Sequence, residues 1–428
     1  MNLRQRIASE AFKARHRTAA KYFTRERKLG FTMLLLSILR KSVKSLQNVL
    51  NELSLLLNLP LMTASGYSQG RQHLSHTAFI ELNRELLVPF YLAQTPSTYQ
   101  GFRLLAGDGS KIRLPAHPTI IEHFGAITTC SGQDATVTGA YPCGLAYVLY
   151  DVLNKIVIDG QLAPARAYEV DLAIGALEQT TATDLLLYDR NFASYRLLAT
   201  LVQRQRHFVI RCSSHSFAVA RTLFVANQET SRLATLVVPT AQKSQSQSAG
   251  LPLSIAVRFV ALRLSTGELE VLVTSLLDQS RFSIADLKAI YHLRWGIETL
   301  FDLLKNRLSL ENFTGKTAQA VRQDFHATLF ITSLESLLTQ EADQRLHQRS
   351  QTHLRGQTVN NMVSFHAIKA QVFHLLDSEL EPEPLLTQLT DLFLMNPSYT
   401  RRMRNVPRRK IKLNAALHFH KRHRKHCF

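Results

Sequence analysis

The spacing of apolar residues divides the chain into a helical beginning, a middle of strand-like runs and a helical end. Residues 31–59 carry leucines and other apolar side chains three and four positions apart, which is typical of an amphipathic helix. Residues 63–86 begin with a Gly- and Ser-containing break and continue in a second helical pattern. Because Pro96 marks a boundary after these patterns, we predict a helical domain over residues 1–98.

Short apolar runs of strand length dominate the next part of the chain. They lie at residues 102–106, 111–114, 144–150, 155–161, 184–188 and 207–212. Helical patterns at residues 168–179 and 194–205 alternate with these runs. The alternation predicts a mixed α/β domain, whose first part we place at residues 99–212.

The alternation stops between residues 213 and 280. Strand patterns occur at residues 217–227, 233–238, 253–264 and 269–276, and a polar loop is expected at 241–251. We therefore predict a β-rich insertion over residues 213–280. The second part of the core would then cover residues 281–345, and a helical C-terminal region with a basic tail would cover residues 346–428.

A long helix is predicted to start at Ser283. Ser283 followed by Asp286 three positions later is a capping-box signal, and no proline interrupts the pattern before Lys305. A helix of about six turns therefore follows. Its apolar stripe consists of Leu293, Ile297, Leu300 and Leu304.

The same helix carries a second stripe of polar residues. Tyr291, Glu298 and Lys305 are seven positions apart and so lie about 20° apart around the helix axis, and Arg294 lies one turn from Glu298. A carboxylate between two cations and a phenol suits a site that holds a metal beside a phosphate chain. The alternative interpretation is a solvated helix face with an ordinary i,i+4 Arg–Glu pair.

Two aspartates follow buried-strand patterns upstream of this helix. Asp108 follows the apolar run in RLLAGDGSKIRL, and Asp189 follows the run in DLLLYDRNF. Open α/β sheets place their chemistry at the ends of such strands. With Glu298, they make a set of three carboxylates from three segments, which suits Mg²⁺ because this ion keeps several waters and takes few carboxylates.

This set of residues resembles the DDE transposases of the insertion-sequence-four family. The matching motifs are GDGS with Asp108, YDRNF with Asp189, and the spacing Y-x2-R-x3-E-x6-K that ends in Lys305. The resemblance covers roughly residues 103–316. One departure is Asn191, because the family often has Gly or Ala before the aromatic residue of the second motif.

The resemblance implies a ribonuclease H-like catalytic core, interrupted by the β-rich insertion, that cleaves DNA with two Mg²⁺ or Mn²⁺ ions per active site. In that family, the residue matching Asp108 bridges the ions, and those matching Asp189 and Glu298 hold one each. The residues that would contact phosphates near the cut are Tyr291, Arg294 and Lys305. The implied reaction is strand cleavage at the ends of a mobile element, often through a DNA hairpin, followed by strand transfer into target DNA.

The implied partners are double-stranded DNA, namely the terminal repeats of the element and the target, and a second copy of the chain in a synaptic complex. Charge supports a polyanion partner, because residues 1–28 and 401–428 hold +7 and +11 of the formal net charge of +19. The alternative for the C-terminal tail is a general contribution to solubility. Candidate DNA contacts are Arg71 and Gln72, in a helix that either reads DNA or only packs, and Arg258 and Arg263 in the insertion.

Other classes of protein receive little support. No apolar run reaches the length of a membrane-spanning helix, and no phosphate-binding glycine motif indicates a nucleoside triphosphate partner. The four cysteines have no zinc-site spacing and are expected to be reduced thiols, so we expect a cytoplasmic protein. The resemblance implies a prokaryotic protein that joins the nucleoid when bound to DNA. Two alternatives to a transposase stay open. One is a metal-dependent nuclease or decayed copy of the same fold, and the other is a DNA-binding protein whose carboxylates are structural.

Overall fold

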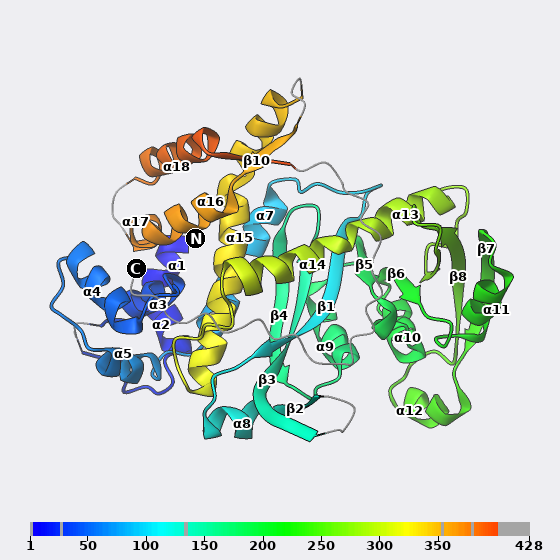
Figure 1. Ribbon diagram of the computed structural model, residues 1–428, viewed down its shortest axis with the longest axis horizontal. Helices are drawn as coiled ribbons and strands as arrows, with labels where there is room; N and C mark the ends of the chain where they lie inside the picture. The colour runs from blue at the N-terminus through cyan, green and yellow to red at the C-terminus, as the bar shows by residue number, and fades with distance from the viewer. Residues whose placement is uncertain (1–2, 26–28, 132–135, 352–354, 378–380, 401–428) are drawn as a thin grey trace. The chain divides into compact units, whose positions relative to one another are not determined.

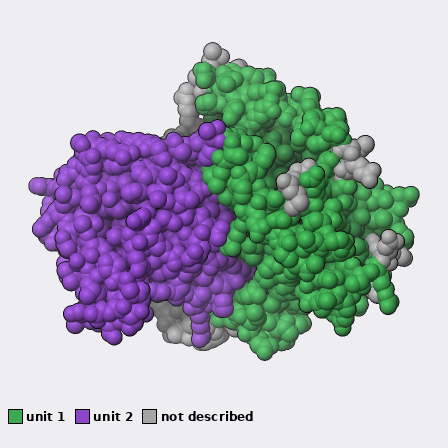
Figure 2. All heavy atoms as spheres, turned by 180° about the vertical axis from the view of Figure 1, so that it is seen from behind, with its two compact units in different colours: residues 1–94, 111–144, 302–428 green, residues 95–110, 145–301 purple. Residues whose placement is uncertain are grey.

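The computed structural model describes residues 3–25, 29–131, 136–351, 355–377 and 381–400. The chain divides into two compact units that Figure 2 colours separately. Residues 1–94, 111–144 and 302–428 contribute to the first unit, and residues 95–110 and 145–301 form the second. The units are interleaved along the chain, and the five segments expected from the sequence remain predictions.

The strands form one mixed sheet of nine members, in the order β2-β3-β1-β5-β6-β9-β8-β7 with β4 paired to β3. The strands are β1 (Arg103–Arg113), β2 (Ala126–Ser131), β3 (Thr136–Asp151), β4 (Ile156–Pro164), β5 (Asp184–Tyr188), β6 (His207–Cys212), β7 (Thr230–Val237), β8 (Ser254–Arg263) and β9 (Leu269–Thr274). β1, β5 and β6 are parallel neighbours, and β6, β9, β8 and β7 pair antiparallel. The prediction of a mixed α/β fold is therefore confirmed.

A buried ion pair fixes the register between β1 and β5. Arg103 lies opposite Asp184 at the start of the two strands. Its Nε and Nη2 atoms donate to the two oxygens of Asp184 at 2.6 and 2.7 Å, and both side chains are buried. A slip by one residue would break this two-point contact and turn every side chain to the other face. The pair thus helps to determine which residues lie side by side at the far ends of the strands.

The segment predicted as a β-rich insertion is only partly β. Strands β7, β8 and β9 lie where strands were expected, but they extend the central sheet through the β6–β9 pairing. The strand expected at residues 217–227 is instead the helix α11 (Ala218–Ala226), which buries Ala220 and Leu223 three positions apart and ends at Asn227 in the left-handed region. The loop expected at residues 241–251 contains the 3-10 turn η4 (Thr240–Gln242) and the helix α12 (Lys243–Ser248).

The other helices of the second unit match the sequence pattern more closely. They are α9 (Glu169–Ala176), continued by the 3-10 turn η2 (Leu177–Gln179), α10 (Tyr195–Gln203), α13 (Ile284–Leu293) and α14 (Trp295–Asp302). The capping box at Ser283 is present, because its Oγ accepts from the Asp286 amide at 3.2 Å and Asp286 accepts from the Ser283 amide at 2.9 Å. The expected unbroken helix is interrupted at Arg294 and continues after α14 as the π-helical turn η5 (Leu303–Arg307). Figure 1 shows α13 and α14 running across the sheet.

The first unit is mainly helical and is built around a helix of 32 residues, α15 (Ala318–Arg349). Its other elements are α1 (Leu3–Ala8), α2 (Glu10–His16), α3 (Phe31–Leu39), α4 (Leu46–Leu56), α5 (Ala64–Arg71), α6 (Thr77–Glu81), the π-helical η1 (Leu82–Leu87), α7 (Val88–Ala93), α8 (Pro118–Phe124), α16 (Asn361–Ala370), α17 (Val372–Asp377), α18 (Glu383–Met395) and the strand pair β10 (Gln357–Val359) and β11 (Pro397–Tyr399). Apolar residues from α1 to η1 and from α15 to α18 form one core cluster. Each of the two helices predicted over residues 31–59 and 63–86 is therefore divided into shorter ones.

The basic N-terminal segment is folded into this unit. The carboxylate of Glu81 in α6 forms ion pairs with Arg6 at 3.1 Å and Arg15 at 2.5 Å, and it contacts the Nε2 atom of His16 at 2.7 Å. These contacts neutralise part of the positive charge that the sequence places at this end of the chain. The basic tail of residues 401–428 lies outside the described residues. Within the described part of the chain, no helix combines the length and the apolar character needed to cross a membrane.

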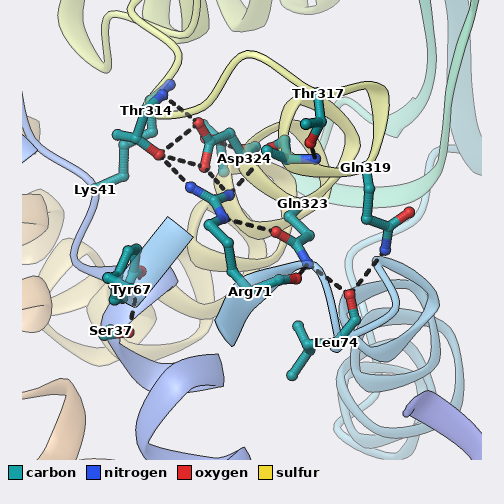
Figure 3. Close-up of polar contacts among 12 residues, drawn as sticks. Ser37, Lys41, Tyr67, Arg71, Leu74, Thr314, Thr317, Gln319, Gln323 and Asp324 are labelled. Carbon is teal, nitrogen blue, oxygen red and sulfur yellow. Dashed lines mark hydrogen bonds and ion pairs between the residues drawn. The ribbon is translucent and has the colours of Figure 1, made fainter. Parts of the chain in front are cut away.

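Arg71 is a correction to the sequence prediction. It ends α5 and is only 2% exposed. Its guanidinium donates to Asp324 at 2.8 Å, Gln323 at 2.8 Å and Thr314 at 2.6 Å, and Figure 3 shows these contacts converging on α15 and the loop before it. The predicted DNA contact by Arg71 is therefore wrong, because the side chain joins two parts of the first unit internally. Its neighbour Gln72 is exposed and stays a candidate.

Candidate active site

The two aspartates found in the sequence come together at one end of the sheet. In the parallel β1–β5 pair, Ala106 lies opposite Leu187. Continuing this register by two residues places Asp108 beside Asp189 on the same face, because side chains alternate along a strand. Asp108 lies within β1, whereas Asp189 follows the last residue of β5. Both side chains are half-buried.

The glycines on either side of Asp108 lie under close neighbours on the opposite face, and glycine is required at position 107, where the neighbour is a buried ring. A Cβ atom on Gly107 would clash with the ring of Tyr188 and would lie 2.5 Å from the Oη atom of Tyr147. A Cβ atom on Gly109 would lie 2.5 Å from a carboxylate oxygen of Glu169 in α9. The sequence Gly-Asp-Gly thus allows buried side chains to press on one face of β1 while Asp108 faces the other.

Replacing Gly107 by alanine should therefore destabilise the second unit. The added methyl group must displace a buried tyrosine ring, and overpacking of this kind costs about 1–3 kcal/mol. The free energy of unfolding from urea titrations measures the effect. Gly175→Ala in α9 is the matched control, because its added methyl group meets nothing closer than 3.8 Å and should leave stability unchanged or slightly higher. Equal stabilities of the two variants would contradict the packing account.

Electrostatics around Asp108 favour a bound cation. Burial, followed by the charge of Asp189, raises the pKa of Asp108 to about 7. The charge of Arg294 and a 2.8 Å hydrogen bond from the Gly109 amide lower the pKa of Asp108 and so offset part of this rise. Asp189 accepts a hydrogen bond of 2.8 Å from the Asn191 amide and caps the 3-10 turn η3 (Arg190–Phe192). A carboxylate whose ionisation is disfavoured by burial and by a neighbouring carboxylate makes, with that neighbour, a fitting pair of ligands for a divalent cation.

Tyr291 lies on α13, Arg294 follows the last residue of this helix, and Glu298 lies on α14. Arg294 Nη2 donates to Glu298 Oε1 at 2.7 Å, and the side chains are 5% and 41% exposed respectively. The guanidinium lies 5.6 Å from the ring centre of Tyr291. The i,i+4 Arg–Glu pair of the alternative interpretation is therefore present, but the helix face is not solvated at Tyr291 and Arg294, which are buried. The Oη atom of Tyr291 and the Nε atom of Arg294 are buried with no hydrogen-bond partner.

Glu298 does not form a three-carboxylate cluster with Asp108 and Asp189. Among the residues that the structure describes, no three His, Cys, Asp or Glu side chains are arranged to hold a metal ion. The Glu298 carboxylate is instead paired with Arg294, whose charge also acts on Asp108. The chemistry of Asp108 and Asp189 fits a divalent cation.

Lys305 belongs to the first unit, where its Nζ donates to the Lys111 carbonyl at 2.9 Å.

One of the two DNA contacts expected in the insertion needs correction. Arg258 is 1% exposed, and its guanidinium donates to Ser231 Oγ at 2.7 Å and to the Phe282 carbonyl at 2.6 Å. It braces β8 against neighbouring segments. Arg263 is partly exposed and stays a candidate.

Three charged residues near the aspartates were missed in the sequence. Glu169 packs on Gly109 and contributes a small charge effect on Asp108. The register of β5 and β6, which pairs Tyr188 with Ile210, places Arg211 beside Asp189. Arg211 Nε in turn forms a 3.0 Å ion pair with Glu270 of β9. Single charges in strand patterns resemble the solvated face of a sheet, so only the register reveals them.

Comparison with known proteins shows the family to which the chain belongs. The model of the Transposase DDE domain family matches residues 101–334, which is more than half of the chain and includes Asp108, Asp189 and Glu298. The chain therefore belongs to the family of transposases with a DDE domain. Transposases of this family are metal-dependent enzymes that cleave and transfer DNA.

Two relatives come from Escherichia coli strain K12. The transposase InsG for insertion sequence element IS4 is 23% identical over 320 residues, which cover 72% of this chain and 70% of the relative. The putative transposase InsZ is 30% identical over 114 residues, so the match spans 26% of this chain and 37% of that relative's length. Among solved structures, the piggyBac transposase in a synaptic complex with hairpin DNA aligns with 88% of this chain and 75% of that chain, at 10% identity and a TM-score of 0.43.

Proposed function

We propose that this protein excises and inserts a mobile DNA element by cleaving phosphodiester bonds at the ends of the element and transferring the freed strands. The observation that carries the proposal is the placement of Asp108 beside Asp189, with the buried Arg294 acting on Asp108 and holding Glu298. This combination offers carboxylates for a cation and a buried positive charge for a phosphate in one site.

The residues that would hold two Mg²⁺ or Mn²⁺ ions are Asp108, Asp189 and Glu298. The chemistry that such ions supply when bound is activation of the attacking hydroxyl and stabilisation of the leaving oxygen. The strand register puts Asp108 beside Asp189, and the charge of Asp189 disfavours ionisation of Asp108. Glu298 would complete the set by leaving its ion pair with Arg294.

DNA would be held by the polar groups that lack partners within the protein. Arg294 Nε and Tyr291 Oη are buried and have no hydrogen-bond partner. The charge of Asp108 acts on Arg294, and the charge of Asp189 acts on Tyr291. A phosphate oxygen would accept from both, and removal of this partner leaves buried donors unsatisfied. Lys305 is proposed as a further phosphate contact, and Gln72 and Arg263 as exposed contacts to more distant DNA.

The strand order supports a ribonuclease H-like core as the finer description of the fold. The five strands β4, β3, β1, β5 and β6 lie next to one another in this order, and β1 runs parallel to β5 and β6. We further propose that two copies of the chain act together on paired element ends and target DNA, in the cytoplasm of a prokaryotic cell and at its nucleoid. A non-transposing nuclease of the same fold is the second candidate, because the same carboxylates would serve it.

An excision assay separates a transposase from the nuclease. The full-length protein is incubated with Mg²⁺ and two plasmids, one carrying the element with both native ends and one with both ends scrambled. A transposase is expected to release the element only from the plasmid with native ends. Equal nicking of both plasmids would favour the nuclease, and no cleavage of either would contradict the proposal.

A further inference from the structure

The first unit contains a large pocket beside helix α5, which we call the α5 pocket. Its volume is about 1070 Å³, and its lining comes from residues 21–29, residues 61–63, one side of α5 and His73. Two of the lining side chains, Met62 and Tyr67, are buried and close it on the inside. Pockets for small ligands usually measure about 300–1,000 Å³, so this one has room for a ligand the size of a nucleotide.

Hydrogen bonds within the unit hold two parts of this lining in place. The amide of Thr18 donates to the His73 carbonyl at 2.8 Å, which ties the segment before residue 21 to the end of α5. The side-chain amide of Gln47 in α4 donates to the Met62 carbonyl at 2.8 Å. The pocket is therefore built from segments that the fold of the first unit fixes against one another.

Aromatic rings form one wall of the α5 pocket. The rings of Tyr22 and His73 stack with their centres 3.7 Å apart and their planes 12° from parallel, and the Phe23 ring lies edge-on at 6.4 Å from His73. All three side chains line the pocket and are half-buried, so each keeps some surface open to it. Such a wall suits a ligand with a flat ring, because stacked and edge-on contacts between rings are favourable.

Positive charge adjoins this wall. Lys21 and Arg25 line the α5 pocket and are exposed, and the Lys21 ammonium lies 5.5 Å from the centre of the Tyr22 ring. None of the lining residues that the structure describes is acidic. In the sequence, residues 21–28 hold four Lys or Arg and one Glu. The pocket is thus complementary to a ligand that combines a flat ring with negative charge.

Two glycines open the helical side of the pocket. Gly66 and Gly70 lie four positions apart in α5, so they share one face of the helix, and both line the pocket. A Cβ atom on Gly70 would meet only a methyl group of Leu29, at 3.8 Å. Glycine weakens a helix, but here it exposes bare backbone that a ligand can approach closely.

We propose that the α5 pocket binds one unpaired nucleotide, with its base on the aromatic wall and its phosphate at Lys21 and Arg25. A flat base and a phosphate are the ligand that stacking rings and nearby cations recognise, and inside a duplex the base faces are already covered. Gln72, proposed above as a DNA contact, directly precedes His73. The site goes beyond the proposed function, because it uses none of the three carboxylates.

Fluorescence anisotropy with the full-length protein in a chelator tests this site apart from any metal. The probes are a labelled blunt duplex and the same duplex with a short 3′ thymidine extension. Stacking of one base on an aromatic side chain is worth about 5- to 150-fold in affinity. We expect the extended duplex to bind more tightly than the blunt one by a factor in this range.

Two substitutions from different segments should remove this preference. Tyr22→Leu takes a ring out of the wall, and Gly70→Leu fills the pocket from α5. Tyr399→Leu is the matched control, because Tyr399 is a 60% exposed tyrosine of the same unit that does not line the pocket, and it should keep the preference. Tyr22→Trp retains a ring and should keep it too, and circular dichroism confirms that each variant is folded.

Competition with dTMP identifies the source of the nucleotide. If dTMP lowers the affinity for the extended duplex to that for the blunt one, the pocket also takes free mononucleotides. A preference that dTMP does not reduce assigns the pocket to nucleotides within DNA.

Two results would overturn the nucleotide site. One is equal affinity of the wild type for the two duplexes, and the other is a preference that persists in folded Tyr22→Leu and Gly70→Leu. Neither result bears on the proposed function, which is judged by cleavage with Mg²⁺.

Discussion

Asp108→Asn is expected to abolish metal-dependent DNA cleavage while making the metal-free protein more stable. Asp108 is held where burial and the charge of Asp189 raise its pKa to about 7, so its ionised form is disfavoured in the folded protein. Asparagine has the same shape without the charge, and we expect a gain on the order of 1 kcal/mol in the free energy of unfolding. Cleavage should fall on the order of 10³-fold or more, because a metal contributes several kcal/mol to stabilising the transition state.

The stability gain should depend on pH in a defined direction. The pKa of Asp108 is about 7 in the folded protein against an ordinary value of 3.8, so the folded chain holds this proton more tightly than the unfolded chain. Wild-type stability is therefore lost as the pH rises from about 4 to about 7. The difference between Asp108→Asn and wild type should be larger at pH 8 than at pH 5.

Urea unfolding in the presence of a chelator at the two pH values measures this difference. Asp171→Asn is the control, because Asp171 is an exposed carboxylate of α9 paired with Arg196 at 2.6 Å, and surface pairs contribute about 0–1 kcal/mol. An Asp108→Asn protein that is less stable than wild type at pH 8, or that cleaves DNA at the wild-type rate, would contradict the account of this site.

Arg71→Met is expected to produce the largest loss of stability in the first unit. The substitution removes the cation that faces Asp324 inside the unit, along with hydrogen bonds to Gln323 and Thr314. Breaking one partner of a buried ion pair costs about 3–5 kcal/mol because the other charge stays buried without compensation. Chemical denaturation monitored by circular dichroism measures the loss.

The neighbouring residue supplies the control for this prediction. Gln72→Ala changes an exposed side chain next in the sequence, and surface changes usually alter stability by less than about 0.5 kcal/mol. Asp324→Asn combined with Arg71→Met should lose less than the sum of the single losses, because the two residues share one interaction. If Arg71→Met kept wild-type stability but lost DNA binding, the original prediction of a DNA contact would be restored.

The parts of the fold that the sequence predicted well are those determined locally. The runs of β5 and β6 can be recognised without knowing their partner strands, because each contains three or more consecutive apolar residues. The capping box at Ser283 is visible because its two partners are three positions apart. For the same reason Asp189, just after a fully buried strand with a run of three leucines, could be identified as a candidate ligand before its neighbours were known.

The parts that could not be predicted depend on residues far away in the sequence. Arg71 looks like a surface residue of a short helix until α15 supplies Asp324 and Gln323 more than 250 positions later. Arg211 and Glu270 are single charges in two strand patterns, and the β6–β9 register brings them together. α11 was taken for a strand because its short apolar run fits both periods, and the spacing of its buried residues decides for the helix.

The central claim is that Asp108, Asp189 and Glu298 act together as a metal-dependent catalytic set. The measurement that tests it most directly is cleavage of labelled element-end DNA by wild type and Glu298→Gln, each with Mg²⁺ and with Ca²⁺, alongside a binding assay on the same DNA. The account predicts cleavage by wild type with Mg²⁺ alone, none by Glu298→Gln, and DNA binding by both proteins. Cleavage by Glu298→Gln at the wild-type rate would contradict it, because Glu298 would then not be a metal ligand.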